Sequence, residues 1–280
     1  MTQRPLPQFL IIGAVKAATT WIADQLRARD DVFMPGPEPH YFSREHDRGA
    51  RWYASLFAEA RSDQLIGEKS ADYLAESEAP ARAAALLPNA MLIAQLRNPV
   101  DRAYSDYCML YRRGQVGRDV ERYLDARSEI PRFLQNGLYA RHIARWRDYF
   151  PPERLKIILY DDIRADPERV LADVCGALQL PPSVIDAERV RRRSNDSEAP
   201  LVPLPLRRLP QSIKNLVAPL RGNPAFEATR RIIARSVEYP RLTSDLRRRL
   251  SDYYADDVAQ LGRLLDRDLS VWSDAARPVP

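Results

Sequence analysis

The stretch FLIIGAVKAATTWIADQL, residues 9–26, decides the fold. An apolar run ends at Gly13 and passes through a short turn into a helical pattern that begins at Thr19. This order is typical of phosphate-binding loops, because the first N–H groups of a helix have no partner within the helix. An ordinary strand-to-helix turn is the alternative. The turn differs from the nucleotide-triphosphate loop G-x-x-x-x-G-K-[ST], because it lacks the second glycine and no hydroxyl residue follows Lys16 directly. We therefore expect a phosphate-bearing ligand other than a metal-bound triphosphate.

The composition indicates a soluble globular protein, with 45% hydrophobic and 29% charged residues in a chain of 280. Its 43 basic and 38 acidic residues give a formal net charge of +5. The arginines are scattered among carboxylates rather than gathered with aromatic residues, which disfavours nucleic-acid binding. The segment MTQRPLPQFLII lacks the pattern of a signal peptide, and no apolar run is long enough to span a membrane. We expect a cytoplasmic protein in which Cys108 and Cys175 are buried, reduced thiols.

Short apolar runs alternate with helical patterns along most of the chain. The predicted strands are residues 9–15, 31–34, 64–70, 90–99 and 154–163. The alternation predicts an α/β fold in which helices cover both faces of a central parallel sheet. Ligands of such sheets bind at the carboxyl ends of the strands, where all the candidate residues below are found.

A single domain spanning residues 1–280 is the predicted organisation. It has an α/β core at 8–180, a basic, proline-rich region at 181–240 and a C-terminal helix at 241–280. Residues 209–220 carry an apolar helical stripe. This stripe could form a lid over an apolar acceptor, an interfacial helix or a homodimer contact, or it could pack on its own domain.

Two motifs carry a family resemblance. GAVKAATTWI (13–22), followed downstream by LRNPVDRAYSDY (96–107), resembles the phosphate-binding elements of sulfotransferases that use 3′-phosphoadenosine 5′-phosphosulfate (PAPS). The bacterial and heparan-type branch of that family also has equivalents of EPHYF (38–42) and GEKSADYL (67–74). The resemblance covers roughly residues 8–180 and the C-terminal helix. It implies the sulfotransferase fold with a P-loop-like phosphosulfate-binding loop, PAPS as donor and 3′-phosphoadenosine 5′-phosphate (PAP) as product.

The resemblance also implies how the donor is bound. The Lys16 ammonium and the backbone N–H groups of the following residues would hold the 5′-phosphosulfate: Ala17, Ala18, Thr19, Thr20 and Trp21. Arg97 and Ser105 would bind the 3′-phosphate, for which a guanidinium group is well suited. Tyr160 resembles an adenine-contacting tyrosine, with a buried core tyrosine as the alternative. Arg193 and Asn195 lie where relatives close a basic loop over the nucleotide.

The catalytic residues implied by the resemblance are Glu38, His40, Lys16 and Lys69. Glu38 matches the general base of the heparan-type enzymes, although Pro37 stands where those enzymes usually have a lysine. His40 would orient the acceptor or share its proton, and cytosolic sulfotransferases use a histidine as base, so the choice between Glu38 and His40 stays open. Lys69 would lie near the transferred sulfuryl group; an ion pair with its neighbour Glu68 is the structural alternative.

The expected function is metal-independent transfer of a sulfuryl group to a hydroxyl, or alternatively an amine, of a carbohydrate, lipid or natural-product acceptor. No group of residues has metal-ligand spacing in the sequence. The alternatives are a small-molecule kinase of the P-loop type and a protein that binds nucleic acid or an anionic surface. The sequence does not select the acceptor.

Overall fold

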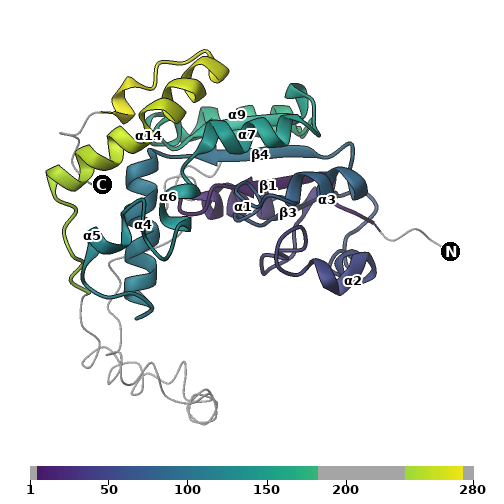
Figure 1. Ribbon diagram of the computed structural model, residues 1–280. Coiled ribbons are helices and arrows are strands. Elements are labelled where there is room, and N and C mark those ends of the chain that lie inside the picture. Colours follow the sequence, from purple (N-terminus) through teal and green to yellow (C-terminus); the bar gives the residue numbers. More distant parts are fainter. Residues whose placement is uncertain (1–4, 182–236, 274–280) are drawn as a thin grey trace, which may run out of the picture.

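A computed structural model describes residues 5–181 and 237–273. The described chain contains one sheet of five parallel strands in the order β2-β3-β1-β4-β5 (Figure 1). The strands are β1 (Phe9–Gly13), β2 (Val32–Phe33), β3 (Leu65–Lys69), β4 (Met91–Leu96) and β5 (Leu155–Leu159). The α/β fold with a central parallel sheet is therefore confirmed.

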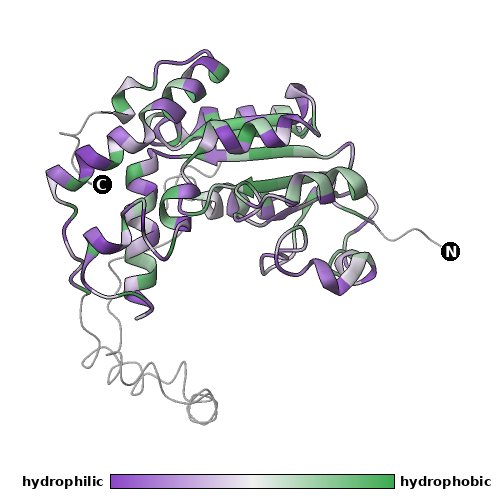
Figure 2. Cartoon of the chain, in the orientation of Figure 1, coloured by the Kyte–Doolittle hydropathy of each residue, from purple (hydrophilic) through white to green (hydrophobic). Residues whose placement is uncertain are grey.

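Alternate residues of the central strand β1 face two separate layers of the core. Leu10 and Ile12 pack in the layer formed with α3 (Ala79–Leu86), α4 (Pro99–Arg112), α7 (Tyr139–Arg147) and α14 (Ser244–Leu265). Phe9 and Ile11 pack in the layer formed with α1 (Thr19–Arg27), α8 (Tyr160–Ala165) and α9 (Pro167–Ala177). The strand is apolar on both faces because helices cover both, and Figure 2 shows the central strands largely in green. The shorter helices are α2 (Gly49–Ser55), α5 (Val120–Tyr123) and α6 (Arg132–Gln135).

All five strands end at the same edge of the sheet because they are parallel. The loop of Lys16 follows β1, the loop of Glu38 follows β2, and Lys69 is the last residue of β3. Arg97 follows β4 and Tyr160 follows β5. The sheet thus brings residues from distant parts of the sequence to one edge, as the strand pattern predicts.

The turn after β1 requires glycine at position 13. Gly13 has a φ of 145°, and a Cβ atom there would lie 2.6 Å from the carbonyl oxygen of Ala71. Both the backbone conformation and this close approach exclude a larger residue. The chain that follows β3 can therefore pass directly beside the loop between β1 and α1.

Several boundaries differ from the sequence prediction. The predicted strand 154–163 ends at Leu159, because Tyr160 begins α8. The predicted helix 241–280 is shorter: α14 ends at Leu265, where Asp266 has a φ of 50°, and a 3₁₀ turn follows at Ser270–Trp272. The start of α4 agrees with the prediction, since Pro99 is its first residue and the Asn98 side chain accepts from the Val100 and Asp101 N–H groups.

Other predictions concern the two cysteines, membrane-spanning helices and residues outside the described ranges. Cys175 is buried and Cys108 half-buried, and both are free thiols. Within the described ranges, no helix combines the length and the apolar character needed to cross a membrane. Arg193, Asn195 and the stripe at 209–220 lie outside the described residues.

Candidate functional site

The loop between β1 and α1 presents unpaired backbone donors. Lys16 and Ala18 adopt left-handed conformations, with φ of 67° and 65°. In the part of the chain that the structure describes, the N–H groups of Lys16, Ala18, Thr19 and Thr20 have no hydrogen-bond partner. The N–H groups of Ala17 and Trp21 are already used, because they donate to the Ala14 and Ala18 carbonyl oxygens at 3.2 and 2.9 Å. The N–H groups of Ala17 and Trp21 are thus used within the loop, whereas Ala18, Thr19 and Thr20 keep free donors at the positive end of α1. That all these N–H groups bind a ligand stays a prediction.

The Lys16 ammonium adds a positive charge to this loop. Among the described residues it has no ion-pair or hydrogen-bond partner. Burial lowers the pKa of Lys16 most strongly; Asp106 acts against this, and the positive charges of Arg97 and Arg113 lower the pKa further. A buried ammonium group among other cations is stabilised when an anion binds beside it.

Arg97 lies next to Lys16. Its guanidinium donates to the Lys16 carbonyl oxygen at 3.5 Å and lies 5.1 Å from the centre of the Tyr160 ring. The Arg97 Nε atom is buried without a hydrogen-bond partner in the described chain. Tyr160 therefore supports Arg97 by a cation–π contact, a role that the sequence did not indicate. Ser105, in α4, is half-buried two turns after the end of β4.

Lys69 lies between the phosphate loop and Glu38. Its ammonium donates to Thr20 Oγ1 at 3.1 Å and is 2.8 Å from Glu38 Oε1. The other Glu38 oxygen, Oε2, accepts from the Ala71 N–H at 2.9 Å. The alternative Glu68–Lys69 pair does not form, because consecutive strand residues point to opposite faces of the sheet.

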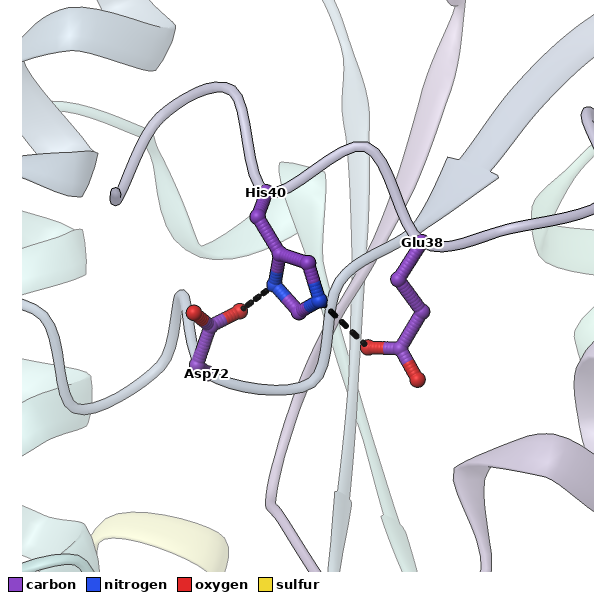
Figure 3. A group of neighbouring side chains, drawn as sticks. All are labelled: Glu38, His40 and Asp72. Carbon is purple, nitrogen blue, oxygen red and sulfur yellow. Dashed lines mark hydrogen bonds and ion pairs between the residues drawn. The ribbon is translucent and has the colours of Figure 1, made fainter. Parts of the chain in front are cut away.

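His40 faces two carboxylates, as Figure 3 shows. Its Nδ1 is 2.7 Å from Asp72 Oδ1, and its Nε2 is 3.9 Å from Glu38 Oε2. Ser43 donates to the second Asp72 oxygen at 2.8 Å. Burial would raise the pKa of Asp72, but the hydrogen bonds and charge of His40, with the bond from Ser43, bring it below its ordinary value. Asp72 is not among the residues predicted from the sequence, although it stands in GEKSADYL three residues after Lys69.

Comparisons with known proteins show the family to which the chain belongs. A family model described as "Sulfotransferase family" matches residues 41–184, which is more than half of the chain. The chain belongs to the sulfotransferase family. The matched span contains Lys69, Arg97, Ser105 and Tyr160, whereas Lys16 and Glu38 precede it.

The curated relatives are longer proteins. Human heparan sulfate glucosamine 3-O-sulfotransferase 6 is 34% identical over 190 residues, covering 66% of this chain and 55% of the relative. Human bifunctional heparan sulfate N-deacetylase/N-sulfotransferase 3 is 31% identical over 285 residues, covering 94% of this chain and 30% of the relative. The chain thus spans about half the length of the 3-O-sulfotransferases that it matches.

A solved bacterial structure covers nearly the whole chain. The sulfotransferase from Alicyclobacillus acidocaldarius superimposes with a TM-score of 0.70 at 25% sequence identity, over 96% of this chain and 100% of that one. The sulfotransferase fold predicted from the sequence is therefore confirmed.

His40 and the two carboxylates that face it form a group with metal-binding atoms. One atom each from Glu38, His40 and Asp72 lies within 4.8 Å of the others. The sequence spacing did not reveal this group, because Asp72 comes from a different loop. The Lys69 ammonium lies 2.8 Å from Glu38 Oε1 and already balances the negative charge of this carboxylate. Metal independence stays a prediction.

Glu68 lies buried beneath the site. Its carboxyl group accepts from Tyr53 at 3.1 Å and from Ser70 at 2.9 Å, and Ser70 Oγ also accepts the His40 N–H at 2.9 Å. Burial raises the pKa of Glu68 to about 7, although the hydrogen bonds from Ser70 and Tyr53 act to lower it. This carboxyl group therefore connects the loop of His40 to the core of the protein, and it keeps its proton at a pH well above its ordinary pKa.

We predict that Glu68 makes folding stability fall as the pH rises. The unfolded chain loses this proton near the ordinary pKa of 4.5, the folded chain near 7. The stability from Glu68 is complete below about pH 4.5 and is lost by about pH 7, a change of about 3 kcal/mol. Urea unfolding measures this effect. Between pH 4.5 and 8, the free energy of unfolding of wild type should fall by about 3 kcal/mol relative to that of Glu68→Gln. Glu153→Gln, at an exposed position, is the control. A constant difference between Glu68→Gln and wild type across this range would contradict the prediction.

Proposed function

We propose that this protein transfers a sulfuryl group from PAPS to a hydroxyl group of a glycan or similar hydroxylated acceptor, and releases PAP. The observation that carries the proposal is the position of Lys69, which contacts both the phosphate loop at Thr20 and the carboxylate of Glu38. A single ammonium group thus lies between a site for an anion and a base. Sulfuryl transfer needs these two sites side by side.

The donor site fits a nucleotide with two separated anionic groups. The free N–H groups of Ala18, Thr19 and Thr20, with the Lys16 ammonium, suit the 5′-phosphosulfate. Arg97, whose Nε has no partner in the described chain, suits the 3′-phosphate together with Ser105. Arg97 contacts the Lys16 carbonyl oxygen, so these two groups are close enough to serve one nucleotide.

The proposed step is a single displacement at sulfur. The acceptor oxygen forms a bond to sulfur while the bond between sulfur and the bridging phosphate oxygen breaks, and PAP leaves with that electron pair. Glu38 accepts the hydroxyl proton, and the positive charges of Lys16 and Lys69 stabilise the negative charge that develops on the bridging oxygen. His40, held by Asp72, faces Glu38 and orients the acceptor.

The acceptor class rests on the relatives. The relatives that the chain matches are named heparan sulfate sulfotransferases, for both O- and N-sulfation. A carboxylate base beside a histidine suits a hydroxyl acceptor, since a hydroxyl group must lose its proton as it attacks. A cytoplasmic location stays a prediction.

Calorimetry with PAP in the presence of EDTA tests the donor site. We expect a dissociation constant between about 1 µM and 1 mM, the range in which the KM values of enzymes lie. AMP, which lacks the 3′-phosphate, is the matched ligand and should bind at least about tenfold more weakly, because it cannot use Arg97. Mass spectrometry of a panel of hydroxylated glycans and metabolites incubated with PAPS should then show a product that gains one sulfate. ATP binding that requires Mg²⁺, without PAP binding, would replace this proposal with the kinase alternative.

A further inference from the structure

The C-terminal turn Ser270–Trp272 is attached to the ends of two strands at the donor site. Trp272 is 2% exposed. Its carbonyl oxygen accepts from Asn98 Nδ2 at 2.9 Å, and its indole N–H donates to Asp161 Oδ2 at 2.8 Å. Asn98 lies just beyond β4 and Asp161 just beyond β5, so one residue bridges the two strand ends.

The two residues that Trp272 holds are the neighbours of the proposed 3′-phosphate site. Asn98 follows Arg97 and Asp161 follows Tyr160, and the Arg97 guanidinium lies 5.1 Å from the centre of the Tyr160 ring. A third contact comes from Tyr139, whose hydroxyl donates to the Arg97 carbonyl oxygen at 2.9 Å. The rings of Tyr139 and Trp272 are 6.3 Å apart, edge to face. Trp272 therefore binds the side chains of the residues that follow Arg97 and Tyr160, and its ring lies against the tyrosine that binds the Arg97 carbonyl oxygen.

We propose that Trp272 is a positioning residue for the donor nucleotide: it holds Arg97 and Tyr160 in the arrangement that binds the 3′-phosphate. This inference rests on the proposed function. Among the residues with described positions, the Arg97 guanidinium makes one hydrogen bond, at 3.5 Å, and lies over the Tyr160 ring. Its Nε atom has no hydrogen-bond partner there. A long side chain held this loosely loses conformational freedom when it binds a ligand, and a rigid support reduces that cost. The indole N–H also donates to the Asp161 carboxylate and so fixes the position of this negative charge near the proposed anion site.

Two substitutions separate the contributions of Trp272. Trp272→Phe keeps an aromatic ring against Tyr139 but removes the N–H bond to Asp161, and Trp272→Ala removes both. Val271→Ala, in the same turn and 52% exposed, is the matched control. We expect PAP to bind about threefold to tenfold more weakly to Trp272→Phe, and weaker still to Trp272→Ala, with Val271→Ala unchanged.

The comparison of PAP with AMP distinguishes positioning from general destabilisation. AMP lacks the 3′-phosphate, so its dissociation constant should change little in the Trp272 variants, and the preference for PAP over AMP should shrink. The KM for PAPS should rise, whereas the KM for the acceptor stays the same. These measurements are made well below the melting temperature of each variant, and if Trp272→Ala does not fold, Trp272→Phe decides the result.

The possible outcomes distinguish failure of the inference about Trp272 from failure of the proposed function. Unchanged PAP affinity and unchanged preference over AMP in folded Trp272→Phe overturn the inference while leaving the proposed function intact. Equal weakening of PAP and AMP also overturns it, because that result assigns Trp272 a structural role alone. A wild-type protein that does not bind PAP overturns the proposed function itself.

Discussion

Replacing Glu38 by glutamine is expected to lower kcat by about 10²- to 10⁴-fold, the range for loss of a general base. Glutamine has nearly the same shape and keeps an oxygen that can accept from the Ala71 N–H, now 2.9 Å from Glu38 Oε2. It cannot accept the acceptor proton, and it removes the negative charge beside Lys69. Steady-state kinetics with saturating PAPS measures the effect. PAP affinity should change little, because Glu38 lies on the acceptor side of Lys69.

Two further variants make this prediction specific. Glu45→Gln lies in the same loop region and should keep nearly full activity. Among the residues that the structure places, Glu45 forms an ion pair with Arg48 alone, at 3.8 Å. His40→Asn should cost less than Glu38→Gln, because His40 is placed to orient the acceptor and faces Glu38 from 3.9 Å. The assignment of Glu38 as the base is wrong if His40→Asn lowers kcat more than Glu38→Gln does.

The sequence predicts which strand ends meet because that relation depends only on the parallel sheet. Apolar runs locate β1, β3, β4 and β5, and the connections make them parallel, so Lys16, Lys69 and Arg97 must lie at one edge. The face of the sheet toward which Lys69 points also follows from the two-residue period of a strand. That period could have excluded the Glu68–Lys69 pair from the sequence alone.

The remaining contacts depend on how loops meet, and no local pattern encodes them. Asp72 pairs with His40 across 32 residues of sequence, and Trp272 reaches Asp161 across 111. The use of the Ala17 and Trp21 N–H groups inside the loop depends on left-handed conformations at Lys16 and Ala18. Alanine and lysine rarely adopt that conformation, so their sequence gives no sign of it.

Replacing Lys16 by alanine is expected to lower kcat by about 10²- to 10³-fold, the range for loss of one preorganised group that stabilises transition-state charge. Its ammonium has no partner among the described residues, so the substitution leaves no buried carboxylate without a counter-charge there. Lys156→Ala, a half-buried lysine on β5, is the matched control and should keep its activity. Lys16→Arg should recover only part of the loss, because a planar guanidinium does not replace a compact ammonium group.

The pH dependence of PAP binding tests the same residue without relying on turnover. Burial lowers the pKa of Lys16 below its ordinary value of 10.5, and a bound anion favours the charged form and raises it again. Binding of PAP therefore takes up a proton at alkaline pH, and the dissociation constant should increase as the pH rises through the pKa of Lys16 in the free protein. Lys16→Ala lacks this group, so its weaker affinity should vary less with pH over the same range, as measured by calorimetry in two buffers of different ionisation enthalpy. Wild type and Lys16→Ala with equal pH dependence and equal proton uptake would show that the Lys16 ammonium does not contact the nucleotide, and the charge that stabilises the leaving group would then have to come from Lys69 alone.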